Sequence, residues 1–329
     1  MGRKPHPLVN QVLKRHALIL LGKGGVGKTS VSAALALTAV RQGESVLVME
    51  SDSHAPMASL FGCEPGFAPI EAAPNLHLMV LDGAHALEEY LRMVVPGRAV
   101  LRAVFASRLY QYFVQAAPGL RELMMLGKLC HEIEESAKSG AQWTRVIFDA
   151  PASGQAINVL RMPVAARETF GESIVGRESS NISQVLRDEH LCSIVQVTTP
   201  DLLSLTETFD TSQALAAMGL KIAAVILNRC DPATFDSGDL ARFAGNPKLR
   251  SLKTIGHLRE LARAEIDRAA MSRSALARLR ESIQSPVIEL GEHRGLSGME
   301  LIRAMAEEFD DQTEPSGGDV SRGLGSVIA

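Results

Sequence analysis

The chain has 329 residues, 46% of them hydrophobic, and a formal net charge of −3 at pH 7. A chain of this length and apolar content can bury a large core, so one large domain is the simplest expectation. The slightly negative charge argues against a nucleic-acid-binding protein, although the N-terminus is locally basic. No apolar run approaches the roughly 18 residues that a membrane-spanning helix requires, so we expect no integral membrane segment.

Four cysteines lie far apart in the sequence, and none belongs to a C-x-x-C pair (Cys63, Cys130, Cys192, Cys230). We expect no secretory signal peptide, and therefore reduced and mostly buried thiols in a cytoplasmic protein. With no thiol pair and only scattered histidines, a structural zinc site is not expected.

Short aliphatic runs alternate with helical segments along the chain. Strands are expected at residues 16–21, 45–50, 75–81, 144–148, 192–198, 222–227 and 286–290. Helices are expected at residues 30–41, 84–94, 98–115, 120–139, 201–218, 259–284 and 297–309. This alternation predicts an α/β fold with a mostly parallel sheet flanked by helices. The expected strands carry few charges, which is typical of strands buried on both faces.

A glycine-rich loop follows the first expected strand. Its residues are Gly22, Lys23, Gly24, Gly25, Val26, Gly27, Lys28, Thr29 and Ser30. The loop fits the phosphate-binding pattern G-x-x-x-x-G-K-[ST], in which backbone N–H groups surround the phosphates. In that pattern Lys28 reaches the β and γ oxygens, and the Thr29 hydroxyl ligates Mg²⁺. Because a strand precedes the loop and a helix follows it, we expect ATP and Mg²⁺ to bind here, rather than an ordinary glycine-rich turn.

Acidic residues follow two of the later strands, at the edge where open α/β sheets bind ligands. Asp149 comes directly after the strand at 144–148, as in a Walker B motif, and is expected to act with Thr29 as a metal ligand. Asp52 follows the strand at 45–50 and is expected to lie at the metal and to orient or deprotonate the attacking water. A helix cap or turn is the alternative for either residue alone. Their order after the phosphate loop favours the site.

These motifs divide the chain into three parts. Residues 1–13 are expected to form a flexible basic N-terminus, 14–309 a P-loop NTPase domain, and 310–329 a disordered tail rich in Gly, Ser and Asp. Two helical subregions, about 84–139 and 161–190, interrupt the strand–helix alternation. The first has an apolar, aromatic-rich middle at helical spacing, which ordinarily indicates packing between helices. A surface for a partner or client protein is the alternative.

The loop and the acidic segments together resemble the ArsA family, which includes arsenite-pump ATPases and the ATPases that deliver tail-anchored membrane proteins. Residues 51–62 fit the family's first switch without a gap and place Asp52 on its water-positioning aspartate. Residues 149–163 have the length and the end residues of its second switch. The segments 203–208, 225–228 and 291–295 are similar to further family motifs, so the resemblance covers about residues 14–309.

The resemblance implies how the site works. In the family's deviant Walker A class, ATPases pair face to face, and the lysine at the position of Lys23 reaches the nucleotide of the partner. The asparagine at the position of Asn228 reads adenine. We therefore expect Lys23, Lys28 and Asp52 to be catalytic, in a homodimer or in a heterodimer with a related ATPase.

The chain also departs from the family pattern. The histidine of the second switch is Gln155 here, and a nearby proline is displaced to Pro151, so the coupling of the switch is expected to differ. The family's zinc-bridging C-x-x-C is missing. Cysteine spacing for metalloid capture is not evident, although three of the cysteines could converge in space. The polar segment 164–190 does not fit a groove for a transmembrane helix.

The sequence thus predicts a Mg²⁺-dependent ATPase that acts as a nucleotide-driven dimeric switch and handles a protein client or partner. A ParA/MinD-type positioning ATPase is one alternative, but it requires a basic DNA-facing patch or a terminal amphipathic helix. A weakly hydrolysing nucleotide-binding subunit of a heterodimer is another, for which Gln155 leaves room. An iron–sulfur reductase of the nitrogenase-iron-protein type would need two bridging cysteines after the switches, and Cys130 and Cys192 are not so placed.

Overall fold

The computed structural model describes residues 7–51, 54–95, 97, 102, 105–107, 119–232, 234–245 and 255–310. Most of the helix expected at 98–115 and the tail expected after residue 310 lie outside this part of the chain. Asp52 also lies outside it.

Eight strands of the described residues form one sheet in the order β3-β4-β2-β5-β1-β6-β7-β8. The strands are β1 (Ala17–Leu21), β2 (Val46–Glu50), β3 (Ile70–Ala73), β4 (Leu76–Val80), β5 (Arg145–Asp149), β6 (Cys192–Thr198), β7 (Ile222–Cys230) and β8 (Val287–Gly291). All neighbouring strands are parallel except β3 and β4. The predicted α/β fold with a mostly parallel sheet is therefore confirmed. Strand β1 lies in the middle, between β5 and β6, so the loop that follows it emerges at the centre of the sheet.

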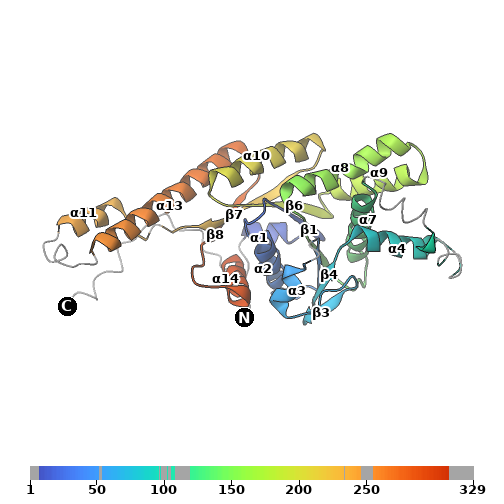
Figure 1. Cartoon of the computed structure of the whole chain (residues 1–329), viewed down its shortest axis with the longest axis horizontal. Coiled ribbons are helices and arrows are strands. Elements are labelled where there is room, and N and C mark those ends of the chain that lie inside the picture. Colours follow the sequence, from blue (N-terminus) through green and yellow to red (C-terminus); the bar gives the residue numbers. More distant parts are fainter. Residues whose placement is uncertain are drawn as a thin grey trace.

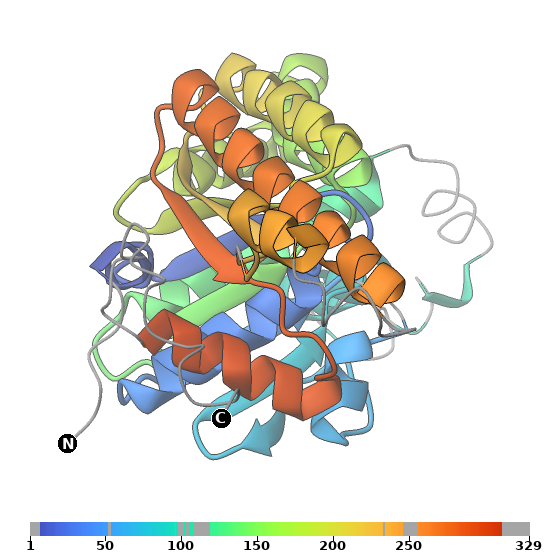
Figure 2. The same cartoon turned by 90° about the vertical axis from the view of Figure 1, so that its left-hand side faces the viewer.

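Helices cover both faces of the sheet (Figure 1). The helices are α1 (Pro7–Val12), α2 (Lys28–Arg41), α3 (Pro56–Phe61), α4 (Gly83–Val94), α7 (Leu120–Ser136), α8 (Ser153–Phe170), α9 (Ile174–Arg187), α10 (Leu202–Ala217), α11 (Ser237–Gly245), α13 (Ile255–Ser282) and α14 (Gly298–Asp310). One face carries α1, α2, α3 and α14, whereas α7, α8, α9, α10 and α13 lie over the other, as the end-on view also shows (Figure 2).

Two apolar cores sandwich the sheet. In β1, Leu18 and Leu20 face the core under α2 and α14, whereas Ile19 and Leu21 face the core under α7, α8 and α9. All these side chains are fully buried. Burial on both faces explains why the strands read as unbroken aliphatic runs rather than as an alternating pattern.

The N-terminal segment differs from the prediction of a flexible lead-in over residues 1–13. Residues 7–12 form α1, and Val9, Val12 and Leu13 are buried in the core beside α2. These three residues recur at helical spacing, so one face of the short helix is apolar and packs against the domain. The prediction is wrong for this stretch.

Four further elements were not predicted at their observed positions, among them α3. Helix α8 begins at Ser153, well before residue 161, so the second helical subregion starts within the second switch. Strand β3 has only four residues, half of them alanine, and lacks the long aliphatic run of a central strand. Helix α11 precedes α13. At the other end of the chain, Asp310 still belongs to α14, where its carboxylate lies 2.8 Å from Nη1 of Arg41 on α2.

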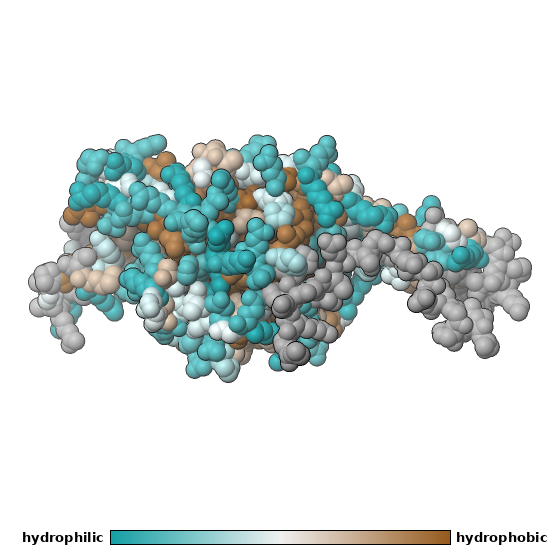
Figure 3. Space-filling view, turned by 180° about the vertical axis from the view of Figure 1, so that it is seen from behind, coloured by the Kyte–Doolittle hydropathy of each residue, from teal (hydrophilic) through white to brown (hydrophobic). Residues whose placement is uncertain are grey.

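The molecule is elongated (Figure 1). Helix α11 and the first part of the 28-residue α13 extend past the sheet at one end, and α4 lies with α7, α8 and α9 at the other. The face seen in Figure 3 is mostly hydrophilic, with apolar residues in separate patches over the central body. Among the helices of the described residues, none combines the length and apolar character that crossing a membrane would require.

Candidate functional site

The loop between β1 and α2 is open on one side and tightly backed on the other. Gly25 and Gly27 have φ angles of 90° and 88°, in the left-handed region where a side chain is strained. A Cβ on Gly22 would lie 2.5 Å from the carbonyl oxygen of Val197, and one on Gly27 would lie 2.5 Å from Nδ2 of Asn228. No atom lies within 4 Å of a Cβ on Gly24 or on Gly25. The loop is therefore pressed against the sheet but leaves its outer side free for phosphates.

The loop leads directly into the positive end of a helix dipole. Helix α2 begins at Lys28, Gly27 caps it without a side-chain hydrogen bond, and its first turn has no acidic residue. The first N–H groups of a helix have no partner within it and bind anions well. Residues 27–30 thus fit a phosphate group by both geometry and charge.

Asp149 contacts three polar side chains at the start of α2. Its carboxylate is 4% exposed and accepts hydrogen bonds from the Thr29 hydroxyl (2.6 Å) and the Ser32 hydroxyl (3.2 Å). The ammonium group of Lys28 lies 3.5 Å from the same carboxylate. Three of the predicted residues, Lys28, Thr29 and Asp149, are therefore in direct contact. Ser32 was not predicted, although it lies one helical turn after Thr29 and on the same face.

The pair of Thr29 and Asp149 fits a hard cation. A hydroxyl and a carboxylate are oxygen ligands of the kind that Mg²⁺ takes, and this ion commonly uses only one or two protein groups beside water and phosphate. Asp52 lies outside the described residues. Its neighbour Ser51 is held close to the site, because the Ser51 hydroxyl donates a 2.9 Å hydrogen bond to the carbonyl oxygen of Asp149.

Glu50 is a buried acid that the sequence analysis missed. It ends β2, is 3% exposed, and pairs in register with Asp149 on β5. Its Oε1 accepts a 2.8 Å hydrogen bond from the backbone N–H of Met57 in the first turn of α3. Glu50 therefore fixes α3, the helix within the first switch, from a position beside Asp149 in the sheet.

The second switch runs into α8 and contacts the phosphate loop. The backbone N–H of Ser153 donates a 3.1 Å hydrogen bond to the carbonyl oxygen of Gly22, and the Ser153 hydroxyl donates to the carboxylate of Glu207 on α10. Gln155 is exposed in the first turn of α8. The start of α8 is thus tied both to the loop and to α10.

Lys23 has a carboxylate near it within its own chain. Asp201 caps α10 and accepts hydrogen bonds from the Thr199 hydroxyl (2.6 Å) and the backbone N–H of Ser204 (2.9 Å). Partial burial raises the pKa of Asp201, but the hydrogen bonds from Ser204 and Thr199 and the charge of Lys23 outweigh it and lower the pKa to about 2. Asp201 is therefore ionised throughout the physiological pH range. The sequence analysis did not single it out.

Asn228 lies directly behind the loop. It is 5% exposed, its Nδ2 donates a 2.9 Å hydrogen bond to the carbonyl oxygen of Val26, and its Oδ1 accepts from the backbone N–H of Arg229. One N–H of the amide remains for a base. Asn228 thus positions the phosphate loop as well as lying at the expected adenine position.

A cavity of about 630 Å³ opens beyond the ends of β6, β7 and β8. Its lining includes Asp201, Arg229, Asp231, Arg268 and Arg294. Asp231 is held there by two arginines, since Nε of Arg268 lies 3.0 Å from its carboxylate and the guanidinium of Arg294 also pairs with it. The position at the carboxyl ends of parallel strands is where a ligand of an α/β sheet is expected.

The cysteines do not gather at this site. Cys130 and Cys192 are buried in the core under α7, α8 and α9, whereas Cys63 packs against the core on the opposite face of the sheet. Convergence of these three thiols, which the sequence left open, is therefore excluded for a single chain. Burial raises the pKa of Cys130 well above its ordinary value, and burial together with nearby acids raises the pKa of Cys192 and of Cys230 to about 12.

These thiol pKa values predict a simple pattern of reactivity. At pH 8 a chromogenic disulfide reagent should modify one thiol quickly, that of the partly exposed Cys63, because thiolates are the reactive form and the other three thiols stay protonated and buried. Denaturation should release all four. The variant Cys63→Ser should lack the fast phase, and two or more fast thiols in the native protein would contradict the prediction.

Comparison with known proteins agrees with this geometry. Residues 15–177 and 175–253 match the model of the anion-transporting ATPase family, ArsA_ATPase. The ATPase BagA of Mycobacterium tuberculosis is 30% identical over 233 residues, which cover 69% of this chain and 68% of that protein. The ATPase GET3 of Chaetomium globosum is 24% identical over 69% of this chain and 77% of its own length. The arsenical pump-driving ATPase of Escherichia coli is 26% identical over 68% of this chain but only 40% of the pump protein.

Proposed function

This chain belongs to the ArsA family of ATPases, and on that basis we propose that it hydrolyses ATP with Mg²⁺ as a dimeric switch that acts on a protein client or partner. The single observation that carries the proposal is the contact of Thr29 and Lys28 with the buried Asp149 at the start of α2. That arrangement brings a phosphate cradle and a pair of metal-binding oxygens to one point.

Different residues of the site have different roles in the proposed phosphoryl transfer. The N–H groups of residues 27–30 and the ammonium group of Lys28 bind and neutralise the phosphates, while Thr29 and Asp149 would hold Mg²⁺, which adds positive charge at the same oxygens. Asp52 would orient the attacking water. Positioning and charge neutralisation supply most of the catalysis of this reaction, so a carboxylate of ordinary basicity is sufficient.

Replacing Asp52 tests the proposed hydrolysis. Asp52→Asn removes the carboxylate but leaves the loop intact, so we expect ATP to bind within about twofold of the wild type while turnover falls on the order of 10²-fold, the lower end of the effect of a catalytic base. Ser53→Ala serves as a neighbouring control and should keep its turnover. The proposal for Asp52 is wrong if Asp52→Asn hydrolyses ATP at the wild-type rate.

The preference for adenine over guanine tests whether the cavity beyond β6, β7 and β8 binds the base of the nucleotide. The sequence Asn228-Arg229-Cys230-Asp231 resembles the N-K-x-D segment that selects guanine, but Asp231 is 10% exposed and already paired with Arg268 and Arg294. It is therefore not free to accept hydrogen bonds from guanine, and we expect GTP to bind at least about tenfold more weakly than ATP, or about 1.4 kcal/mol. Parallel titrations with both nucleotides measure this, and equal affinities would contradict it.

The proposed dimer is supported by the charges around Lys23. A lysine at the position of Lys23 would be redundant beside Lys28 unless it met a further negative charge. Asp201 supplies such a charge within one chain, and we propose that Lys23 exchanges it for the partner's triphosphate when two subunits meet. We propose that a client acts on the helices that lie together at one end of the molecule, α4, α7, α8 and α9 (Figure 1).

A further inference from the structure

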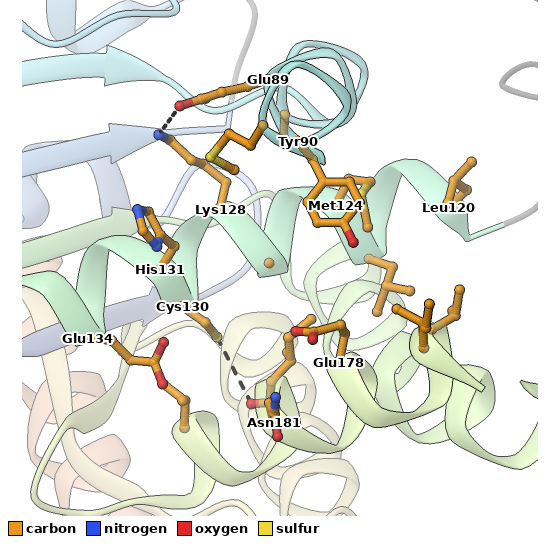
Figure 4. A pocket seen from close by; sticks show the side chains of 18 residues that line it. Glu89, Tyr90, Leu120, Met124, Lys128, Cys130, His131, Glu134, Glu178 and Asn181 are labelled. Carbon is orange, nitrogen blue, oxygen red and sulfur yellow. Dashed lines mark hydrogen bonds and ion pairs between the residues drawn. The ribbon is translucent and has the colours of Figure 1, made fainter. Parts of the chain in front are cut away.

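An apolar pocket lies among α4, α7 and α9, far along the chain from the phosphate loop. Its volume is about 310 Å³, and each of the three helices contributes a stripe of residues one turn apart. Leu123 on α7 and Ile182 and Val185 on α9 form part of its interior and are less than 8% exposed. Figure 4 shows residues of all three helices around this space. The volume lies at the lower end of the range for small-molecule sites, about 300–1,000 Å³.

A glycine in the middle of α7 borders the pocket. Gly127 lines the pocket, and a Cβ there would have one neighbour within 4 Å, Cδ1 of Ile182 at an ordinary 3.8 Å. Alanine would therefore fit without strain, and glycine is less favourable than alanine inside a helix. Glycine instead of alanine at this position brings no benefit to packing between helices, whereas it leaves more space in a pocket.

The charges around the pocket are unbalanced. Three carboxylates, those of Glu89, Glu134 and Glu178, line it beside one ammonium group, that of Lys128, and the imidazole of His131. Lys128 already pairs with Glu89 at 2.7 Å (Figure 4) and with Glu132 at 2.9 Å. Burial lowers the pKa of Lys128, but its hydrogen bonds to the two glutamates raise the pKa above the ordinary value overall. The ammonium group therefore stays charged and is already paired within the protein.

The other two carboxylates remain available. Glu134 and Glu178 are exposed and make no ion pair within the described part of the chain. They come from different helices, Glu134 from α7 and Glu178 from α9, and Glu178 extends from α9 beside Asn181 (Figure 4). An apolar interior bordered by two unpaired carboxylates is complementary to a ligand that is apolar at one end and positively charged at the other.

We propose that this pocket binds small cationic amphiphiles, molecules with an apolar body and a protonated amine. The body fills the space beside Gly127, and the amine pairs with one of the two unpaired carboxylates at its border, that of Glu134 or that of Glu178. A small molecule fits better than a peptide helix, because a volume of about 310 Å³ suits a small ligand and is too small for an amphipathic helix. Binding at this place requires no nucleotide and is independent of the ATPase proposal.

Three probes with one apolar body test the charge requirement. We would titrate the full chain, without nucleotide, with 4-phenylbutylamine, 4-phenylbutanol and 4-phenylbutyrate by ligand-observed NMR and calorimetry. The amine should bind about tenfold more tightly than the alcohol, and the carboxylate should bind more weakly than either. Equal affinities for the three probes, or no binding of the amine at millimolar concentration, would overturn the proposal.

Matched variants test the location. The double variant Glu134→Gln and Glu178→Gln should reduce amine binding to that of the alcohol and leave the alcohol unchanged, while Glu135→Gln, on α7 but not in the lining, should change neither. Gly127→Leu should fill the pocket and abolish binding, and if it fails to fold, the glutamine variants still decide. Unchanged amine binding in the double variant would overturn the proposal, as would a basic amphipathic peptide that binds here when the amine does not.

Discussion

Lys28→Ala should abolish detectable ATP binding and reduce hydrolysis by about 10²–10³-fold, the usual effect of removing one preorganised electrostatic group. Lys28 lies at the first position of α2 and is 13% exposed, so its charge acts at the phosphates with little screening by solvent. Calorimetric titration with ATP and a steady-state phosphate assay measure the two effects.

The variant needs a control for stability. Lys28 pairs with Asp149, so its removal leaves a buried carboxylate held only by Thr29 and Ser32. The double variant Lys28→Ala and Asp149→Asn removes the uncompensated charge and should recover the melting temperature, but not ATP binding. Normal ATP affinity in a folded Lys28→Ala protein would show that the loop binds phosphate in some other way.

Lys23→Ala should bind ATP almost normally but should lose the dimer that ATP stabilises, and hydrolysis should fall with it. The two lysines carry the same charge on the same loop, so this pair of variants separates binding within one chain from an action on the partner. A charge-assisted contact across a dry interface stabilises both the dimer and the transition state. Sedimentation with a slowly hydrolysed ATP analogue measures the association, alone and with any related ATPase that copurifies.

A variant of Asp201 gives a second test of the role of Lys23 in the dimer. Asp201→Asn removes the carboxylate that lies near Lys23 in the single chain, so the lysine is released for the partner and dimerisation should require less ATP analogue. A Lys23→Ala protein that still dimerises with the analogue as the wild type does would refute the role in trans. Lys23 would then serve only its own nucleotide.

The sequence predicted best what lies within a few residues along the chain. The loop at 22–30 is contiguous and stands between an aliphatic strand and a helix, so its place in the fold followed from local pattern alone. The central strands were found because burial on both faces makes them uniformly apolar. Strand β3 was missed because it is a short edge strand, and α1 because its six residues carry only a short apolar stripe.

Contacts between distant segments account for what was missed at the site. Ser32 lies 117 residues from Asp149 in sequence, and Arg294 lies 63 residues from Asp231, so no local motif announces either contact. The second contact bears on the expected preference for adenine: Asp231 resembles a guanine-reading residue in sequence but is paired with two arginines in the fold. Glu50 was hidden for a further reason, since a single acid at the end of a strand has no distinctive spacing.

Helix α8 has the geometry of a lever. It has 18 residues and is therefore about 27 Å long at 1.5 Å per residue. Its first residue is bonded to the carbonyl of Gly22, and beyond its last turn the chain enters α9, which borders the apolar pocket. A tilt of about 10° at the fixed end would move the far end by about 5 Å, given that length. A displacement too small to break one hydrogen bond at the phosphate loop would therefore be enough to reshape the opposite end of the molecule.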